Sequence, residues 1–162
     1  MACVAFSLLG AGGARGEPSR DFELYDFADR LVSLKRVRAE ARLVVVEFFS
    51  EVCKPCKAAL PRWAALERRL AGRGLRVVVV AVPPGDADRE EARARAASYF
   101  KGEGLGLVAV WDKYTVVAKR FGVAKGESLR LPQAFLLDGA GRLVAQSAEV
   151  APLEREIVKR LK

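Results

Sequence analysis

The sequence predicts an α/β domain of three layers, with helices on both sides of a mixed central sheet. Segments of strand character alternate with segments of helical periodicity through the middle of the chain, an order that is typical of parallel strands joined by right-handed crossovers. A strand–turn–strand pattern and a helix then close the chain, so the final strands are expected to be antiparallel. The 162 residues are enough for one such domain and its core.

The first elements are strands. Short strands are expected at residues 21–27 and 31–37, on either side of a turn at 28–30. Residues 43–49 follow as Leu-Val-Val-Val-Glu-Phe-Phe, a nearly continuous run of β-branched and aromatic residues. Such a run is typical of a strand that is buried on both faces.

A helix is expected from Pro55 to about Ala71. Proline is tolerated in the first turn of a helix, where its missing N–H has no partner to lose. Apolar residues then recur at helical spacing, namely Ala59, Leu60, Trp63, Leu66 and Leu70. Glycines at 72 and 74 end the helix. Trp63, Trp111 and Phe135 are assigned to core packing.

The rest of the chain continues the alternation. The expected elements are a buried strand at 75–82, a helix at 86–101, a strand at 107–111, a short helix at 112–121, strands at 134–137 and 143–147, and a closing helix at 153–161. Asp112 is a candidate N-cap for the short helix. The residues Asp138-Gly139-Ala140-Gly141 form a turn that pairs the last two strands as a hairpin.

The net charge of +8 suggests nucleic acid or an anionic membrane surface as a partner. The basic residues are spread over the helical segments beside Asp and Glu, however, and no basic run is longer than two residues. A solvated surface explains this pattern, so we expect no nucleic-acid partner. No apolar run reaches the roughly 18 residues of a membrane-spanning helix.

The chain has 3 Cys and 0 His, which excludes Ser–His and Cys–His nucleophile pairs, His-ligated zinc and haem ligation by His. Cys53 and Cys56 are three residues apart at the start of a helix, on one face and within disulfide range. The helix N-terminus, with Lys54 and Lys57, stabilises a thiolate at Cys53. We expect Cys53 to attack a substrate disulfide and the more shielded Cys56 to resolve the mixed disulfide.

Two other interpretations of this pair remain open. A structural zinc site needs four ligands, which Cys53, Cys56 and the distant Cys3 do not supply. Two inert core cysteines fit the spacing, although the strand before them and the proline between them argue against it. We expect neither a metal nor a cofactor.

The segment Val46-Glu47-Phe48-Phe49-Ser50-Glu51-Val52-Cys53-Lys54-Pro55-Cys56 resembles the active-site segment of the thioredoxin superfamily. Pro61, five residues after Cys56, matches the proline that kinks the active-site helix. The N-terminal strand pair and the inserted helix and strand at about residues 86–111 resemble the TlpA/ResA-like branch of thiol–disulfide oxidoreductases. The resemblance covers residues 21–162 and implies a thioredoxin-like domain there.

Under this resemblance Glu47 matches the buried acidic residue beneath the disulfide, and would carry a proton to or from Cys56. The alternative is a strand-end carboxylate paired with a lysine such as Lys57. The sequence departs from the branch at Val52 and Phe49, where tryptophan is common, and at Ala59, where some ResA-like reductases have glutamate. Glu47 is then the one obvious proton carrier.

The resemblance also implies a substrate-binding loop. Leu131-Pro132 matches the cis-proline loop, in which cis Pro132 keeps metals from the cysteines and the backbone of Leu131 binds an extended peptide, beside Lys54 and Pro55. The alternative is an ordinary trans proline at the start of a strand, since few X–Pro bonds are cis.

Residues 1–20 are expected to be an export-signal remnant or a disordered tail. The apolar run Val4–Leu9 precedes small residues of the kind that a signal peptidase accepts, although no basic region comes before it. Cys3 is a candidate for lipid attachment, and hence for membrane anchoring, if more chain lies upstream.

The predicted function is exchange of a Cys53–Cys56 dithiol or disulfide with protein substrates, as an extracytoplasmic, periplasmic reductase. Apocytochrome c or another redox protein is a candidate substrate, and an electron-donating redox partner is required. The alternatives are a disulfide oxidase or isomerase, since the Lys-Pro dipeptide does not settle the direction, and a non-catalytic binding module. A peroxidase is disfavoured because those enzymes use a different cysteine motif.

Overall fold

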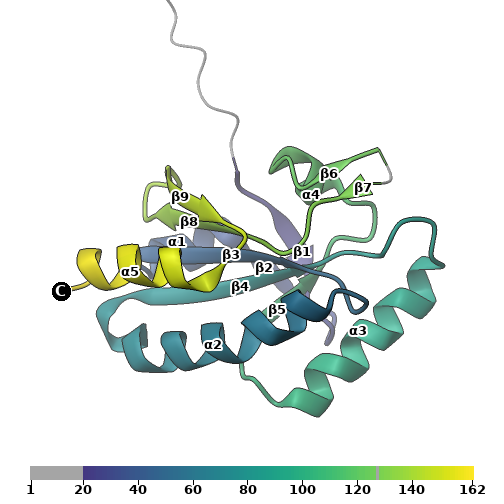
Figure 1. Ribbon diagram of the computed structural model, residues 1–162, viewed down its shortest axis with the longest axis horizontal. Helices are drawn as coiled ribbons and strands as arrows, with labels where there is room; N and C mark the ends of the chain where they lie inside the picture. Colours follow the sequence, from purple (N-terminus) through teal and green to yellow (C-terminus); the bar gives the residue numbers. More distant parts are fainter. Residues whose placement is uncertain (1–19, 127) are drawn as a thin grey trace, which may run out of the picture.

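Five strands form the central sheet of the computed structural model, which describes residues 20–126 and 128–162 (Figure 1). The strands are β3 (Leu43–Phe49), β4 (Leu75–Ala81), β5 (Val108–Trp111), β8 (Gln133–Asp138) and β9 (Leu143–Ser147). Their order in the sheet is β5-β4-β3-β8-β9. β3, β4 and β5 are parallel, whereas β8 is antiparallel to both β3 and β9. The predicted mixed sheet is confirmed.

β3 is the middle strand, and all of its residues are buried. Because side chains alternate along a strand, β3 contributes to two separate apolar layers. The first core layer contains Leu43, Val45 and Phe49, and the second core layer contains Val44, Val46 and Phe48. Glu47 occupies an odd-numbered position, so its side chain points to the side of the first core layer.

Helices complete both layers. Those that pack into the first core layer are α2 (Lys54–Leu70), α3 (Arg89–Glu103) and α5 (Val150–Arg160), and those that pack into the second are α1 (Leu34–Ala39) and α4 (Val116–Arg120). A turn of 3-10 helix, η1 (Ala71–Arg73), follows α2 and ends at Gly74. Gly74 has φ of 93°, and a Cβ there would lie 2.9 Å from Cγ of Arg42. Only glycine fits this turn without strain.

Two small hairpins lie outside the central sheet. β1 (Glu23–Tyr25) pairs with β2 (Leu31–Ser33), and β6 (Ala124–Lys125) pairs with β7 (Ser128–Leu129). An isolated bridge from Asp26 to Val110 joins the first hairpin to β5, at the edge of the sheet. The sequence predicted the first hairpin. The second was missed because its strands are only two residues long and carry no alternating pattern.

The strand expected at 31–37 is wrong in its second half, because β2 ends at Ser33 and α1 follows. Leu34 and Arg38, one helical turn apart, are both buried. The guanidinium of Arg38 pairs with Asp21 at 2.6 Å and donates to the carbonyl of Gly139 at 2.9 Å. These tertiary contacts stabilise a helix in a segment whose β-branched residues favoured a strand.

Asp112 does not occupy the N-cap position that the sequence predicted for it. The N-cap of α4 is Thr115, whose side chain makes no capping hydrogen bond. The Asp112 carboxylate nevertheless accepts from the backbone N–H of Val116 at 2.9 Å and of Ala118 at 2.8 Å. It therefore satisfies free N–H groups of the helix from three residues farther upstream.

Residues 1–19 lie outside the described part of the chain, and the predictions that fall there include the export-signal remnant and Cys3. Within the described part, no helix has the length and apolar character needed to cross a membrane.

Candidate active site at the start of α2

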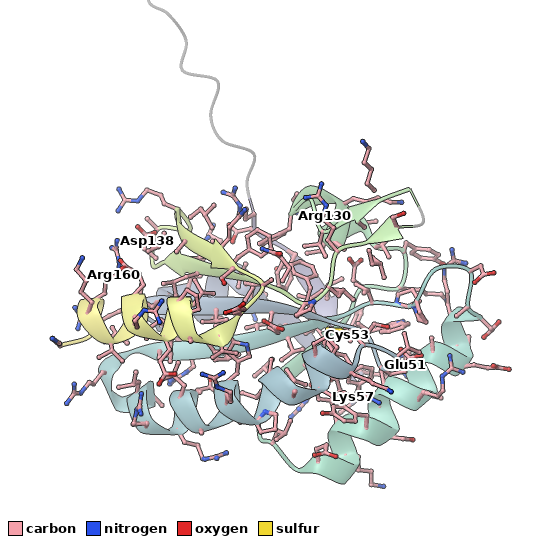
Figure 2. All side chains as sticks on the ribbon, in the orientation of Figure 1. Glu51, Cys53, Lys57, Arg130, Asp138 and Arg160 are labelled. Carbon is pink, nitrogen blue, oxygen red and sulfur yellow. A yellow bond between two sulfur atoms is a disulfide. The ribbon has the colours of Figure 1, made fainter. Side chains whose placement is uncertain are left out.

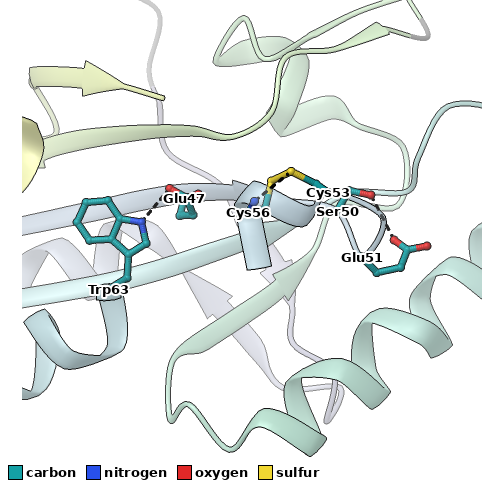
Figure 3. Close-up of a disulfide and its surroundings, with 6 residues drawn as sticks. All are labelled: Glu47, Ser50, Glu51, Cys53, Cys56 and Trp63. Atoms are coloured by element: carbon teal, nitrogen blue, oxygen red, sulfur yellow. Dashed lines mark hydrogen bonds between the residues drawn. A yellow bond between two sulfur atoms is a disulfide. The ribbon is translucent and has the colours of Figure 1, made fainter. Parts of the chain in front are cut away.

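Cys53 and Cys56 form a disulfide at the N-terminus of α2, with 2.03 Å between the sulfur atoms and 5.3 Å between the Cα atoms (Figure 3). Cys53 is the N-cap residue, and its backbone N–H donates to the carbonyl of Ser50 at 2.9 Å. The N–H of Cys56 donates to Sγ of Cys53 at 3.2 Å. The first turn of the helix therefore presents an N–H group to the sulfur where a thiolate would form.

The two cysteines differ in access. Cys53 is half-buried, whereas Cys56 is 0% exposed. Lys54 and Pro55 between them are exposed, and Val52 just before them is 64% exposed. A second sulfur can reach Cys53 from solvent while Cys56 stays covered, which is the asymmetry expected of an attacking and a resolving cysteine.

Glu47 lies under the start of α2, with 2% of its surface exposed. Its Oε2 accepts a hydrogen bond from Nε1 of Trp63 at 3.1 Å. Burial raises the pKa of Glu47 to about 8, although the hydrogen bond from Trp63 opposes the shift. Near neutral pH this carboxyl is therefore poised between its charged and neutral forms.

The lysine partner considered for Glu47 is not seen. In the described part of the chain, no Lys or Arg forms an ion pair with Glu47. Nζ of Lys57 instead lies 5.1 Å from the centre of the Tyr99 ring, a cation–π contact with α3. The environment of Glu47 is thus set by burial and one indole.

Leu131 and Pro132 precede β8, and the peptide bond between them is cis. The register pairs Gln133 with Phe48, at the end of β3 from which the chain continues toward Cys53. Leu131 is partly buried against both core layers. The sheet therefore brings this loop to the same edge as the cysteines, from a segment far away in the sequence.

Sequence reasoning missed the ion pair of Glu51. Glu51 is only 7% exposed, and its Oε1 accepts from Arg95 of α3, which lies 3.0 Å away. The hydroxyl of Ser50 donates to its Oε2 at 3.3 Å. Figure 3 shows Ser50 and Glu51 in the loop beside the disulfide. The partners are 44 residues apart in the sequence, so no local pattern could have indicated the pair.

Aromatic contacts hold α3 against the same region. The ring of Phe49 stacks on Tyr99 with 5.2 Å between the centroids, and it contacts Phe100 at 5.0 Å. Figure 2 shows Lys57 and Glu51 near Cys53, on the side where α3 passes. The inserted helix predicted from the sequence thus forms one wall of the candidate site.

Three or more His, Cys, Asp or Glu side chains arranged to hold a metal ion are not found among the residues that the structure describes. The reactive groups at this site are two sulfur atoms, a buried carboxyl and backbone N–H groups.

Comparisons with known proteins concern the family and the fold of the chain. The model of the AhpC/TSA family matches residues 16–146. A curated relative, the thiol–disulfide oxidoreductase ResA of Bacillus thuringiensis (strain Al Hakam), is 23% identical over 131 residues, which are 81% of this chain and 68% of the relative.

Two solved structures are also similar. A hypothetical protein from Sinorhizobium meliloti 1021 has a TM-score of 0.66 and 28% identity, over 78% of this chain and 66% of that one. A thiol:disulfide interchange protein of the thioredoxin family from Chlorobium tepidum TLS has a TM-score of 0.70 and 20% identity, over 92% of this chain and 99% of that one. The latter likeness supports the thioredoxin-like fold.

Proposed function

This chain belongs to the AhpC/TSA family, and from that premise we propose that it is a thiol–disulfide oxidoreductase that exchanges its Cys53–Cys56 pair with protein thiols and disulfides. One observation carries the proposal. A half-buried cysteine at a helix N-terminus is disulfide-bonded to a fully buried one, above a carboxyl whose pKa is raised to about 8. The curated relative is named for the same chemistry.

In the reducing direction, the Cys53 thiolate attacks one sulfur of a substrate disulfide. A mixed disulfide forms, and the other substrate sulfur leaves as a thiolate. Glu47, as a carboxylate, takes the proton of the Cys56 thiol, and the Cys56 sulfur attacks Sγ of Cys53. The second substrate thiolate leaves, two electrons have passed to the substrate, and the protein is in the disulfide form that the structure contains.

We propose that Lys54, Pro55, Leu131 and Pro132 form the surface that receives the substrate. The exposure of Lys54 and Pro55 supports this role, as does the position of the Leu131–Pro132 loop beside the end of β3. A substrate peptide that extends along the loop would align its sulfur with Cys53 through backbone hydrogen bonds.

We assign the reductase direction, which requires a redox partner that returns two electrons to the disulfide, and a location outside the cytoplasm. The apolar run Val4–Leu9 and the small residues after it support export. Apocytochrome c is one substrate to test. Equilibration with glutathione measures the direction: a reduction potential well above that of the glutathione couple would reverse it and make the protein an oxidase or isomerase.

Trapping tests the activity itself. In a Cys3→Ser background, Cys56→Ser should accumulate a mixed disulfide through Cys53, whereas Cys53→Ser should trap nothing. A binding module without catalysis would instead keep its biological role in Cys53→Ser. Consumption of peroxide by the wild-type protein, faster than its exchange with disulfides, would point to a peroxidase.

A further inference from the structure

The hydrogen bond between Trp63 and Glu47 joins two buried polar groups in the first core layer. Trp63 is 0% exposed and Glu47 is 2% exposed, and Nε1 donates to Oε2 at 3.1 Å. Trp63 lies seven residues, or about two helical turns, after Cys56 on α2. Cys56 and Trp63 both belong to the first core layer, so their side chains lie on the same face of α2.

The two oxygens of the Glu47 carboxyl differ. Oε2 accepts from the indole, whereas Oε1 is buried and has no hydrogen-bond partner within the described residues. Figure 3 shows Glu47 between Trp63 and Cys56, with one oxygen joined to the indole. A buried polar atom without a partner is costly, and a role in catalysis is one reason for which such an atom is retained.

We propose that Trp63 is a positioning residue for thiol–disulfide exchange: its indole N–H fixes Oε2 of Glu47, so that Oε1 is the atom that exchanges the proton with Cys56. This inference rests on the proposed function and goes beyond it, because it assigns the proton to one oxygen and gives a task to a residue expected only to pack. The indole N–H of Trp63 bonds to Glu47, so Trp63 acts on the sulfur atoms through that carboxyl.

Among the residues that the structure describes, the indole of Trp63 is the one side chain that forms a hydrogen bond with Glu47. The strand residues paired with it are Val79 on β4 and Ala134 on β8, and neither can be charged. On α2, Cys56 titrates when it is reduced. The one carboxyl of α2, Glu67, whose pKa is raised by burial, accepts a hydrogen bond from the backbone N–H of Val77 at 2.9 Å. α5 contributes apolar side chains to this layer.

The direction of the effect follows from the bond. An N–H that donates to a carboxylate stabilises the charged form, so the indole lowers the pKa of Glu47 against the larger effect of burial. Without the N–H, less carboxylate is present near pH 7. The step in which Oε1 takes the Cys56 proton, while the Cys56 sulfur bonds to Sγ of Cys53 and the substrate thiolate leaves, would then need a higher pH.

Trp111 is a matched control. It is the only other tryptophan of the chain, it is 7% exposed, and its Nε1 has no partner among the described atoms. Trp111→Phe therefore removes an N–H that has no partner among the described atoms, at a similar cost in packing.

The first test is the pH profile of mixed-disulfide resolution. Trp63→Phe keeps a ring and removes the N–H, and it should move the profile upward by about one pH unit, which slows resolution at pH 7 about tenfold. Trp111→Phe should leave the midpoint unchanged, and Trp63→Phe should not move it in a Glu47→Gln background. An unchanged midpoint in Trp63→Phe, or an equal shift in Trp111→Phe, would overturn the proposal.

The second test needs no turnover. In oxidised Trp111→Phe, Trp63 is the sole tryptophan, so its fluorescence should titrate with a midpoint near the pKa of Glu47, about 8, and should be flat when Glu47→Gln is added. Fluorescence that does not respond to pH, or that responds equally after Glu47→Gln, contradicts the hydrogen bond between Trp63 and Glu47. If the wild-type protein itself shows no thiol–disulfide exchange, the proposed function is rejected. Failure of the Trp63 proposal and failure of the proposed function can therefore be told apart.

Discussion

On one side of β3, Val44, Val46 and Phe48 pack with other apolar side chains in the second core layer. On the other side, in the first core layer, Glu47 stands in the row between Val45 and Phe49. The side chains of β3 are buried on both sides of the sheet. The rings of Phe48, Phe121 and Phe135 pack in tilted and edge-on contacts, with centroids 5.0 to 5.8 Å apart.

The difference separates stability from reactivity. The residues that make up the second core layer are apolar, and their packing stabilises the fold. The first core layer gives up stability to keep a carboxyl out of water, and under the proposed mechanism this carboxyl carries a proton beneath the disulfide. A substitution in the second core layer should therefore change the free energy of unfolding without changing the rate of exchange.

The largest effect is expected for Cys53→Ser, which should abolish exchange because no other sulfur near α2 is exposed in the described structure. Its unfolding free energy should stay within about 0.5 kcal/mol of the reduced wild-type protein, because serine is close to cysteine in size and is a preferred N-cap residue at this position. Disulfide-reduction assays and urea unfolding measure the two properties. Residual turnover above that of free thiols would contradict the assignment.

Next comes Phe135→Ala in the second core layer. Removal of this ring leaves a cavity beside Phe48 and Phe121, and should lower the unfolding free energy by about 3–5 kcal/mol. Exchange per folded molecule should not change. Phe135→Leu, which fills more of the space, is the control and should cost less. A change in the reduction potential of the folded variant would show that the two sides are coupled.

The third prediction concerns pH and Glu47. Folding raises the pKa of this carboxyl from 4.5 to about 8, so the folded state holds a proton that the unfolded state has lost. The wild-type protein should therefore be most stable below pH 4.5 with respect to this group, and should lose about 1.4 kcal/mol per pH unit as the pH rises through this window.

Glu47→Gln should remove that slope, as measured by urea unfolding at pH 5, 7 and 9. The same variant should slow the resolution step by about 100-fold, a usual value for the loss of a general base. A parallel slope in both proteins would mean that Glu47 ionises in the folded state at its ordinary pKa.

The smallest effect is expected for Arg95→Ala, at the wall between α3 and the active-site loop. Arg95 is half exposed and its partner Glu51 is nearly covered, so loss of the pair should cost only about 1 kcal/mol. Exchange at low substrate concentration should fall because the loop before Cys53 loses a restraint. Adding Glu51→Gln removes the unpaired charge and should restore part of the stability; a further loss would argue against the pair.

Sequence reasoning worked best where the pattern and the tertiary role coincide. The run at 43–49 is a central strand, and the apolar spacing after Pro55 is α2, because burial on both faces or on one helical face leaves a mark in the sequence. The pair Cys53 and Cys56 could be found in the same way, because helix geometry fixes the distance between positions three apart.

It failed where a residue depends on a distant partner. Residues 34–37 become helical through the contacts of Arg38 with Asp21 and Gly139. Trp63 has the spacing of a packing residue, and only the fold shows that its N–H meets Glu47. Both failures concern polar contacts made inside the fold, which leave no periodic signal in a single sequence.

The full burial of Cys56 beside Cys53, with Cα atoms 5.3 Å apart, has a kinetic consequence. Once a substrate is joined to Cys53, its release is an intramolecular reaction, and the effective concentration of the second thiol does not depend on how much protein or substrate is present. The rate of release is therefore a property of this chain and not of the protein concentration. Under the proposed mechanism, the sequence of a substrate governs how soon it is captured, whereas the time that it stays bound is set by Cys56 and by the proton at Glu47.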